Sequence, residues 1–339
     1  MTEKRISYTD LDRLLARLAE ERAVCAPRKD EAGQVALLTL ARDEPVDLEY
    51  ANFRLSPKAF LFPQNQTLVL FRDGKAEEPD LPGRETILFG VRPCDARAIR
   101  ALDRVFLDGD LRDPYYAARR AAVTVIALAC ARPMSSCFCT SVGGGPGSPR
   151  RPAGADVLAV ALEKDLLLKA ESPKGEQLLS SVSDLLADAG PAAIKEAEER
   201  IQAAADQMAP VAVENIARRL GDAYESPLWQ DAGRKCLGCG TCSFLCPTCH
   251  CFDITDEVRN GTGRRIRTWD CCAYPLFTLH ASGHNPRPTP KERWRQRLMH
   301  KFRYAVENFD SLFCVGCGRC IRNCPVGMDL RTVLKEVGA

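Results

Sequence analysis

Two runs of cysteines carry the clearest chemistry in this sequence. One run spans residues 236–246 and the other spans residues 314–324, and a proline follows the last cysteine of each. Both read C-x2-C-x2-C-x3-C-P, the spacing at which thiolates ligate [4Fe–4S] clusters, with the fourth cysteine of each run bound to the other cluster. The sequence therefore predicts two clusters. Their ligands are Cys236, Cys239, Cys242 and Cys324 for the first cluster, and Cys314, Cys317, Cys320 and Cys246 for the second.

Glycines stand between the cysteines of both runs, at positions 238, 240, 316 and 318. Glycine lets a tight loop adopt positive φ and lets backbone N–H groups approach the sulfurs. The alternative to iron is zinc, which is usually bound by two C-x2-C pairs. Four cysteines at 2-2-3 spacing followed by proline favour iron–sulfur clusters over zinc.

Length, charge and cysteine content exclude several classes of protein. The chain has 339 residues, of which 45% are hydrophobic and 27% charged, and its net charge is +2. Such a chain is too long for one hydrophobic core, and its charge gives no basis for binding nucleic acid or a membrane surface. No apolar run approaches the roughly 18 residues of a membrane span. Seventeen cysteines without an apolar secretion signal predict metal ligation in a reducing compartment, so we expect a cytoplasmic protein.

Apolar runs in the first half predict an α/β domain with a buried sheet. An amphipathic helix is expected from Ser7 to Glu21, with Thr9 and Asp12 forming a capping box, and a second helix is expected over 96–106. Strands are expected at Val35–Leu40, Thr67–Phe71, Thr86–Val91, Val123–Cys130 and Val157–Leu162.

The predicted organisation has three parts. Residues 1–188 form the α/β domain, residues 189–228 form a helical connector, and residues 229–339 form an α-helical, bacterial-ferredoxin-like dicluster domain. A long insertion, residues 247–313, separates the two cysteine runs. It should begin with a hairpin that turns at Asn260-Gly261, a pair that favours a type I′ turn, and end with a basic helix from Lys291 to Phe309.

Arginines are concentrated in two stretches of this insertion, residues 264–267 and 293–297. Clusters held by four thiolates are anionic, so nearby arginines would offset their charge and tune their reduction potentials. The other interpretation is that both stretches are solvated surface.

Four of the remaining cysteines follow or precede predicted strands of the α/β domain. Cys94 begins a helix after one strand, Cys130 ends the next strand, and Cys137 and Cys139 lie in the following loop. Loops at strand ends are common ligand sites in α/β domains, so these four cysteines predict a third metal site. The alternative is that they are core residues, as free cysteine often is. Cys25, at a helix end, is expected to be an ordinary buried residue.

A second group of extra cysteines lies near the first run in sequence: Cys249, Cys251, Cys271 and Cys272. No spacing rule decides whether they line the first cluster, bind a further metal or form a redox relay. His250 is placed to touch a cluster, but the four histidines show no zinc-binding pattern. The sequence contains no nucleophile–base or paired-carboxylate constellation, so we predict no catalytic residues.

Longer motifs make the chain similar to a known family, the iron–sulfur subunit shared by cytoplasmic sulfhydrogenases (the beta subunit) and anaerobic sulfite reductases. The resemblance covers most of the chain. It rests on Gly90-Val91-Arg92-Pro93-Cys94-Asp95, Asp113-Pro114-Tyr115-Tyr116, Cys137-Phe138-Cys139-Thr140-Ser141, Cys246-Pro247-Thr248-Cys249-His250-Cys251-Phe252 and Phe313-Cys314-Val315-Gly316-Cys317-Gly318-Arg319-Cys320. The sequence departs from the expected pattern at Val142, where methionine is expected, and at Cys271, where serine is expected.

The resemblance implies an electron-transfer subunit with two [4Fe–4S] clusters and no catalytic residues of its own. FAD and NAD(P) are expected on a partner subunit, and the hydrogenase or sulfur/sulfite reductase centre on another. Two alternatives are a self-sufficient small-molecule reductase that uses a third cluster in the α/β domain, and a zinc-stabilised interaction module. The terminal electron acceptor is not identified by the sequence.

Overall fold

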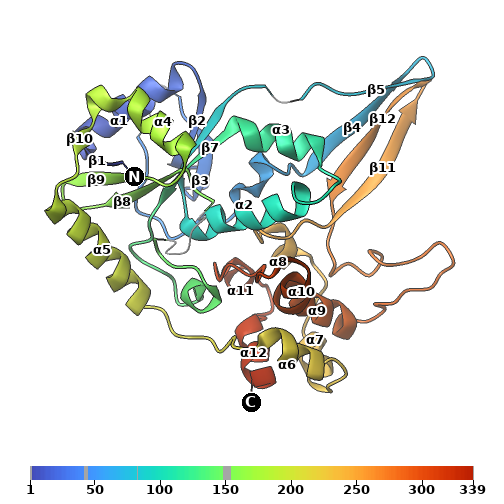
Figure 1. The fold of residues 1–339 in the computed structure, drawn as a ribbon. Helices are drawn as coiled ribbons and strands as arrows, with labels where there is room; N and C mark the ends of the chain where they lie inside the picture. Colours follow the sequence, from blue (N-terminus) through green and yellow to red (C-terminus); the bar gives the residue numbers. More distant parts are fainter. Residues whose placement is uncertain (1, 42–44, 82, 148–153, 339) are drawn as a thin grey trace. The chain divides into compact units, whose positions relative to one another are not determined.

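The computed structural model describes residues 2–41, 45–81, 83–147 and 154–338 and divides into two compact units (Figure 1). The first unit comprises Met1–Pro57, Pro82–Pro210 and Val315–Cys317. The second comprises Lys58–Leu81, Val211–Cys314 and Gly318–Ala339. Each unit therefore contains segments that are distant in the sequence.

The described part of the first unit is built on an eight-stranded mixed sheet. Its strands, in spatial order, are β10 (Ala187–Asp188), β1 (Glu3–Ser7), β9 (Asp165–Ala170), β8 (Val157–Ala161), β7 (Val123–Leu128), β6 (Thr86–Val91), β2 (Ala23–Lys29) and β3 (Val35–Thr39). The four neighbours β8, β7, β6 and β2 are parallel, and the other pairs are antiparallel. This confirms the expected α/β region and the predicted strands β3, β6, β7 and β8.

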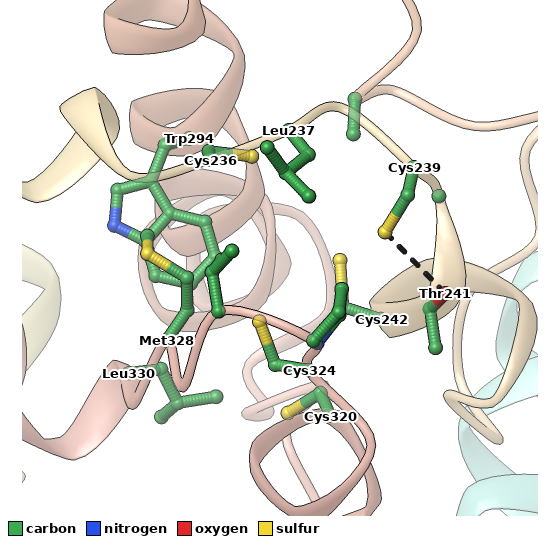
Figure 2. Close-up of a pocket in the computed structure, with 14 residues that line it drawn as sticks. Cys236, Leu237, Cys239, Thr241, Cys242, Trp294, Cys320, Cys324, Met328 and Leu330 are labelled. Carbon is green, nitrogen blue, oxygen red and sulfur yellow. Dashed lines mark hydrogen bonds between the residues drawn. The ribbon is translucent and has the colours of Figure 1, made fainter.

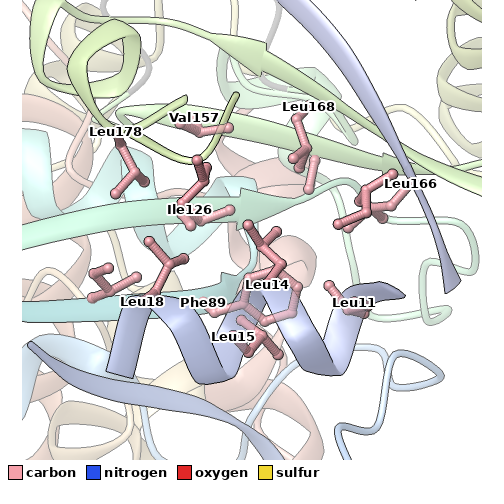
Figure 3. Close-up of a cluster of buried hydrophobic side chains, with 14 of the residues drawn as sticks. Leu11, Leu14, Leu15, Leu18, Phe89, Ile126, Val157, Leu166, Leu168 and Leu178 are labelled. Atoms are coloured by element: carbon pink, nitrogen blue, oxygen red, sulfur yellow. The ribbon is translucent and has the colours of Figure 1, made fainter. Parts of the chain in front are cut away.

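Helices cover both faces of this sheet. On one face, α1 (Tyr8–Ala19) and α4 (Pro173–Ser181) pack on alternate residues of the strands, such as Leu166 and Leu168. Leu167, between them, packs with α5 (Pro191–Asp206) on the other face. Figure 3 shows the four buried leucines of α1 directed at the sheet. Because successive residues of a strand point to opposite faces, a strand that is apolar throughout must be covered on both sides.

The N-terminal helix begins at a different cap from the one that the sequence predicts. Its N-cap is Ser7, whose hydroxyl accepts a hydrogen bond from the Asp10 N–H, so the expected capping box at Thr9 and Asp12 is wrong. The residues before it form β1, which pairs with β9 through contacts such as Ile6 with Leu166. Strand pairing fixes the chain up to Ser7 and thereby places the first helical turn.

Two helices connect β6 to β7. They are α2 (Pro93–Phe106), which confirms the helix expected over 96–106, and α3 (Pro114–Ala122). Asp103 of α2 is buried and accepts hydrogen bonds from the Tyr116 hydroxyl and the Arg120 Nε of α3, at 2.9 and 3.1 Å. This polar contact joins the two helices and satisfies a buried carboxylate.

A close backbone approach sets the position of α4. The Asp156 carboxylate accepts hydrogen bonds from the Val125 N–H (2.8 Å) and the Ser172 hydroxyl (2.7 Å). Ser172 caps α4, and a Cβ added at Gly175 would lie 1.9 Å from the Asp156 carbonyl oxygen. Only glycine permits this distance between the helix and the strand.

A Gly175→Ala substitution should therefore destabilise the first unit. Overpacking of this kind costs about 1–3 kcal/mol, and each kcal/mol should lower the Tm by roughly 2–4 °C in a chain of this size. Differential scanning calorimetry under anaerobic conditions measures the change. Gly83→Ala is the matched control, because a Cβ at Gly83 would meet nothing within 4 Å. Equal Tm values for the two variants would contradict the packing argument.

The second unit contains an antiparallel four-stranded sheet in the order β11 (Phe252–Arg259), β12 (Thr262–Trp269), β4 (Asn65–Arg72) and β5 (Lys75–Glu77). Asn260 and Gly261 join β11 to β12 with φ values of 52° and 77°, which confirms the predicted type I′ hairpin. The strand predicted at 67–71 is confirmed as β4, and it pairs with β12 of this unit.

Short helices make up most of the rest of the second unit. They are α6 (Ile216–Asp222), α7 (Leu228–Arg234), α8 (Thr241–Phe244), α9 (Pro290–Met299), a π-helical turn (His300–Tyr304), α10 (Ala305–Phe309), α11 (Arg319–Arg322) and α12 (Leu330–Gly338). The continuous segment from α9 to α10 confirms the predicted basic helix. Among the described residues, no helix has the length and apolar character needed to span a bilayer.

Candidate iron–sulfur sites

The two cysteine runs have the same local backbone geometry. Gly240 and Gly318 have φ values of 74° and 69°, and each is the N-cap of a four-residue helix, α8 or α11. Gly238 and Gly316 also have positive φ, 69° and 66°. The predicted positive φ of these glycines is confirmed, and L-residues with side chains rarely adopt such values.

Cysteines from both runs surround one pocket of the second unit. Cys236, Cys239 and Cys242 line it together with Cys324, and Figure 2 shows their sulfurs around a common space. The space measures about 470 Å³, open solvent included, and Cys320 lines it as well. The fourth cysteine of the second run thus joins the first three cysteines of the first run, as the spacing predicts for the first cluster.

The rest of the pocket wall is apolar. Trp294, Met328 and Leu330 form part of it, and Trp294 and Leu330 are buried. An apolar wall excludes water and lowers the local dielectric constant, which strengthens the interaction of a bound anionic group with nearby charges. On the open side Cys239 is exposed, and its Sγ lies 3.4 Å from the Thr241 hydroxyl.

The donor set fits a cluster better than a single ion. A zinc ion bound by four cysteines requires all four sulfurs at about 2.3 Å from one point. Within the described ranges, no three histidine, cysteine, aspartate or glutamate side chains approach closely enough to share one ion. Thiols that surround a space instead suit a cluster of several irons. Cys246, Cys314 and Cys320 belong to the second unit and Cys317 to the first, so the ligand set of the second cluster stays a prediction.

Three buried cationic side chains lie among the cysteines of the second unit. Arg297 of α9 donates hydrogen bonds to the Cys242 carbonyl oxygen (2.7 Å) and to the Cys249 Sγ (3.5 Å). Lys301, in the π-helical turn, donates to the Thr248 hydroxyl at 2.9 Å, and Lys58 donates to the Cys249 carbonyl oxygen at 2.9 Å. Buried cations are retained where anionic groups compensate for their desolvation, so this region is built to hold negative charge.

The pKa shifts of Lys301 and Arg297 agree with a region that holds negative charge. Burial lowers the pKa of Lys301, but the neighbouring Cys246 and Cys249 sulfurs outweigh it and raise the pKa above its ordinary value. The pKa of Arg297 is also raised above its ordinary value. Burial lowers it, but the neighbouring Cys242 and Cys249 sulfurs outweigh the effect of burial. Both side chains therefore remain protonated at neutral pH. The pKa of Lys58 is lowered, because its burial dominates.

The structure distinguishes the two interpretations of the arginine-rich stretches, charge compensation of the clusters and solvated surface, residue by residue. Arg297 is buried among sulfurs, which supports the charge-compensation hypothesis for the α9 stretch. Arg264 and Arg265 on β12 are exposed and pair with Glu257 and Asp256 across the hairpin, as solvated surface residues do. The sequence pattern does not indicate Lys58, because Lys58 lies far from both runs in sequence, and it does not single out the Thr248 hydroxyl.

Four further cysteines of the second unit are brought together. Cys249, Cys271 and Cys272 are buried, and Cys251 is partly buried. The Cys249 thiol donates to Cys246, which lowers the pKa of Cys246 well below its ordinary value. Hydrogen bonds from Cys251 and Cys271 similarly lower the pKa of Cys272. The hydrogen bonds thus favour the thiolate forms of Cys246 and Cys272, an effect that no spacing rule in the sequence indicates.

His250 packs against other aromatic rings. Its ring lies 5.3 Å from that of His300 and 6.2 Å from that of Phe313, centroid to centroid. Burial, followed by the neighbouring His300, lowers the pKa of His250 to about 4, and burial lowers that of His300 to about 4. Both rings are therefore neutral at physiological pH, and contact of His250 with a cluster stays a prediction.

The four cysteines of the predicted third site lie in the first unit. Cys94, Cys130, Cys137 and Cys139 line one hollow, as the strand-end argument predicts. Burial, and then the nearby Cys130 and Cys137 sulfurs, raise the pKa of Cys139 to about 12. Cys25 is buried, as expected of an ordinary residue, but it lies on β2 and not at a helix end, and its Sγ is 3.8 Å from the Thr39 hydroxyl of β3.

Comparison with known proteins agrees with the motifs. A model of the 4Fe-4S dicluster domain matches residues 235–328, which include both cysteine runs. Sulfhydrogenase 2 subunit beta of Pyrococcus furiosus is 33% identical over 301 residues, an alignment that covers 87% of this chain and 86% of that protein. With its α/β first unit and its iron–sulfur dicluster domain, the chain belongs to the sulfhydrogenase beta-subunit family.

Proposed function

We propose that this chain is the electron-transfer component of a multisubunit oxidoreductase and relays electrons through two [4Fe–4S] clusters. The observation that carries the proposal is the pocket that Cys236, Cys239 and Cys242 share with Cys324. The matching geometry of the second run supports an equivalent second cluster. When bound, such clusters exchange single electrons at potentials that hydrogen bonds, charge and solvent exposure determine.

The residues of the chain perform three tasks in this proposal. The eight run cysteines hold the clusters as thiolates. Trp294 and Leu330 exclude water from one of them. Arg297 and Lys301 compensate for the negative charge, which makes the reduced state less costly than it would be in an apolar site without cations.

The family membership supports partners on both sides of the relay. One redox partner that we propose is a flavin- and NAD(P)-binding subunit, and the other is a hydrogenase or a sulfur/sulfite reductase subunit. Anaerobic purification of this chain from the native host should recover both partners with it, and the chain should be brown because it holds iron–sulfur clusters. The chain should contain at least eight irons, about four for each of two clusters. A colourless, zinc-loaded chain without partners would contradict the proposal.

A second candidate function is a self-sufficient reductase with its active site at the hollow lined by Cys94 and Cys130. The position of that hollow, at the carboxyl ends of β6 and β7, favours this candidate because ligands often bind there. One assay distinguishes the relay from the reductase. The isolated chain, reduced by an artificial donor, should not reduce sulfite or polysulfide if it is a relay, whereas sustained turnover would favour the reductase.

A further inference from the structure

Sheet topology brings two cysteines of the first unit to the same edge. β6 and β7 are adjacent and parallel, so their carboxyl ends coincide. Cys94 lies in the first turn of α2, directly after β6, and Cys130 follows the end of β7. Residues after neighbouring parallel strands approach one another whatever their distance in sequence.

Arg92 holds these two chain ends together. It is buried and donates hydrogen bonds to the carbonyl oxygens of Leu128 and Ala129, at 3.2 and 2.8 Å. It also donates to the Tyr50 carbonyl oxygen, and its guanidinium lies over the Tyr50 ring, 3.8 Å from the centroid. The residues just before Cys94 and Cys130 are therefore fixed to each other through one side chain.

The loop that carries Cys137 and Cys139 is fixed by a close backbone contact within the same unit. The Phe138 N–H donates to the Gly316 carbonyl oxygen at 2.9 Å, and the Phe138 side chain is buried. A Cβ at Gly316 would lie 2.5 Å from the Cys139 Cα, and Gly316 has positive φ, so only glycine fits there. This contact fixes the backbone between Cys137 and Cys139 against the backbone of Gly316.

The four thiols surround a hollow rather than fill a core. All four cysteines are only partly buried and line a space of about 370 Å³, open solvent included. A cysteine packed into a core would instead be buried, as Cys25 is. Within the described residues these thiols do not converge on the position of a single ion. Four thiols around a space are the donor set of an iron–sulfur cluster.

We propose that Cys94, Cys130, Cys137 and Cys139 bind a third [4Fe–4S] cluster. This inference rests on the proposed electron-transfer function and extends it. Cys317, a predicted ligand of the second cluster, lies on the wall of the same hollow, and its carbonyl oxygen is 3.9 Å from the Cys137 Sγ. A cluster in this position is therefore adjacent to a predicted ligand of the relay within the same unit.

Iron and acid-labile sulfide counts on the full chain, purified anaerobically and reconstituted, test the proposal. The wild-type chain should contain about twelve irons, four for each cluster, and both Cys94→Ser and Cys137→Ser should contain about eight. Electron paramagnetic resonance of the reduced variants should show the same component missing from both. Cys25→Ser, which alters a buried cysteine of the same unit outside the hollow, should retain about twelve irons.

The outcomes separate this inference from the proposed function. A wild-type count of about eight irons, unchanged in Cys94→Ser and Cys137→Ser, overturns the third cluster and leaves the two-cluster relay intact. A count of about ten overturns the four-iron assignment, because it corresponds to a two-iron cluster. Circular dichroism of each variant verifies that the α/β unit is folded, so that iron loss reports on ligation. If substitution of the run cysteines removes no iron, the proposed function fails instead.

Discussion

Cys324→Ala should remove the same cluster as Cys236→Ala, although the two cysteines belong to different runs. Cys324 lines the pocket with Cys236, Cys239 and Cys242, and an alanine there leaves the cluster with three ligands. The expected loss is about four irons per chain, together with nearly all electron transfer from the flavin subunit to the catalytic subunit. Iron counts and the paramagnetic resonance spectra of the two reduced variants measure it.

Cys314→Ala is the complementary variant. It should also lose about four irons, but its spectrum should lack the other component, because Cys314 is a predicted ligand of the second cluster. The first unit should remain folded in all three variants, and Cys25→Ala should keep its full iron content. If Cys324→Ala and Cys314→Ala lacked the same component, each run would ligate its own cluster, and the predicted ligand exchange would be wrong.

Arg297→Gln should lower the reduction potential of the first cluster. Arg297 is the buried cation that donates to the Cys242 carbonyl oxygen and the Cys249 Sγ. Removing its charge favours the oxidised cluster, which carries less negative charge than the reduced one. A loss of about 1.4 kcal/mol in this interaction corresponds to about 59 mV for a one-electron couple, so we expect a shift of that order or larger. Potentiometric titration followed by paramagnetic resonance measures it.

Two further variants define the origin of the shift. Arg295→Gln is the matched control on α9, because the Arg295 guanidinium lies over the Tyr224 ring and donates to the Tyr224 carbonyl oxygen instead of to a cysteine. It should leave the potential unchanged. Lys301→Met removes a second buried cation among these cysteines, and it should lower a cluster potential in the same direction. An unchanged potential in a folded, iron-replete Arg297→Gln variant would show that this arginine is structural.

Local sequence patterns are sufficient to predict much of the fold. The turn at Asn260-Gly261 and the strands of the α/β region follow from backbone preference and from apolar runs, which act over a few residues. The start of the first helix cannot be read in this way. Thr9 and Asp12 satisfy a capping pattern, but pairing of β1 with β9 fixes Ser7, and the long-range contact overrides the local preference.

The assignment of β4 to the second unit also depends on distant contacts. Its residues are apolar like those of the other strands, and they precede β6 in sequence, so the sequence predicts them in the same domain. Pairing with β12 on one side and β5 on the other places β4 in the four-stranded sheet instead. A strand pattern specifies a pleated segment but not its partner, because backbone hydrogen bonds carry no sequence information.

The sequence by itself determined the chemistry of this protein: the spacing of the run cysteines and the glycines between them predicts two iron–sulfur clusters. Ligands within one run are local, and local geometry follows from residue type and spacing. Only the tertiary structure decided which distant groups join them. It placed Cys324 beside the first run, Arg297 and Lys58 among buried sulfurs, and Cys94 near Cys139. These contacts arise from strand order and helix packing, which depend on how the whole chain buries its apolar surface.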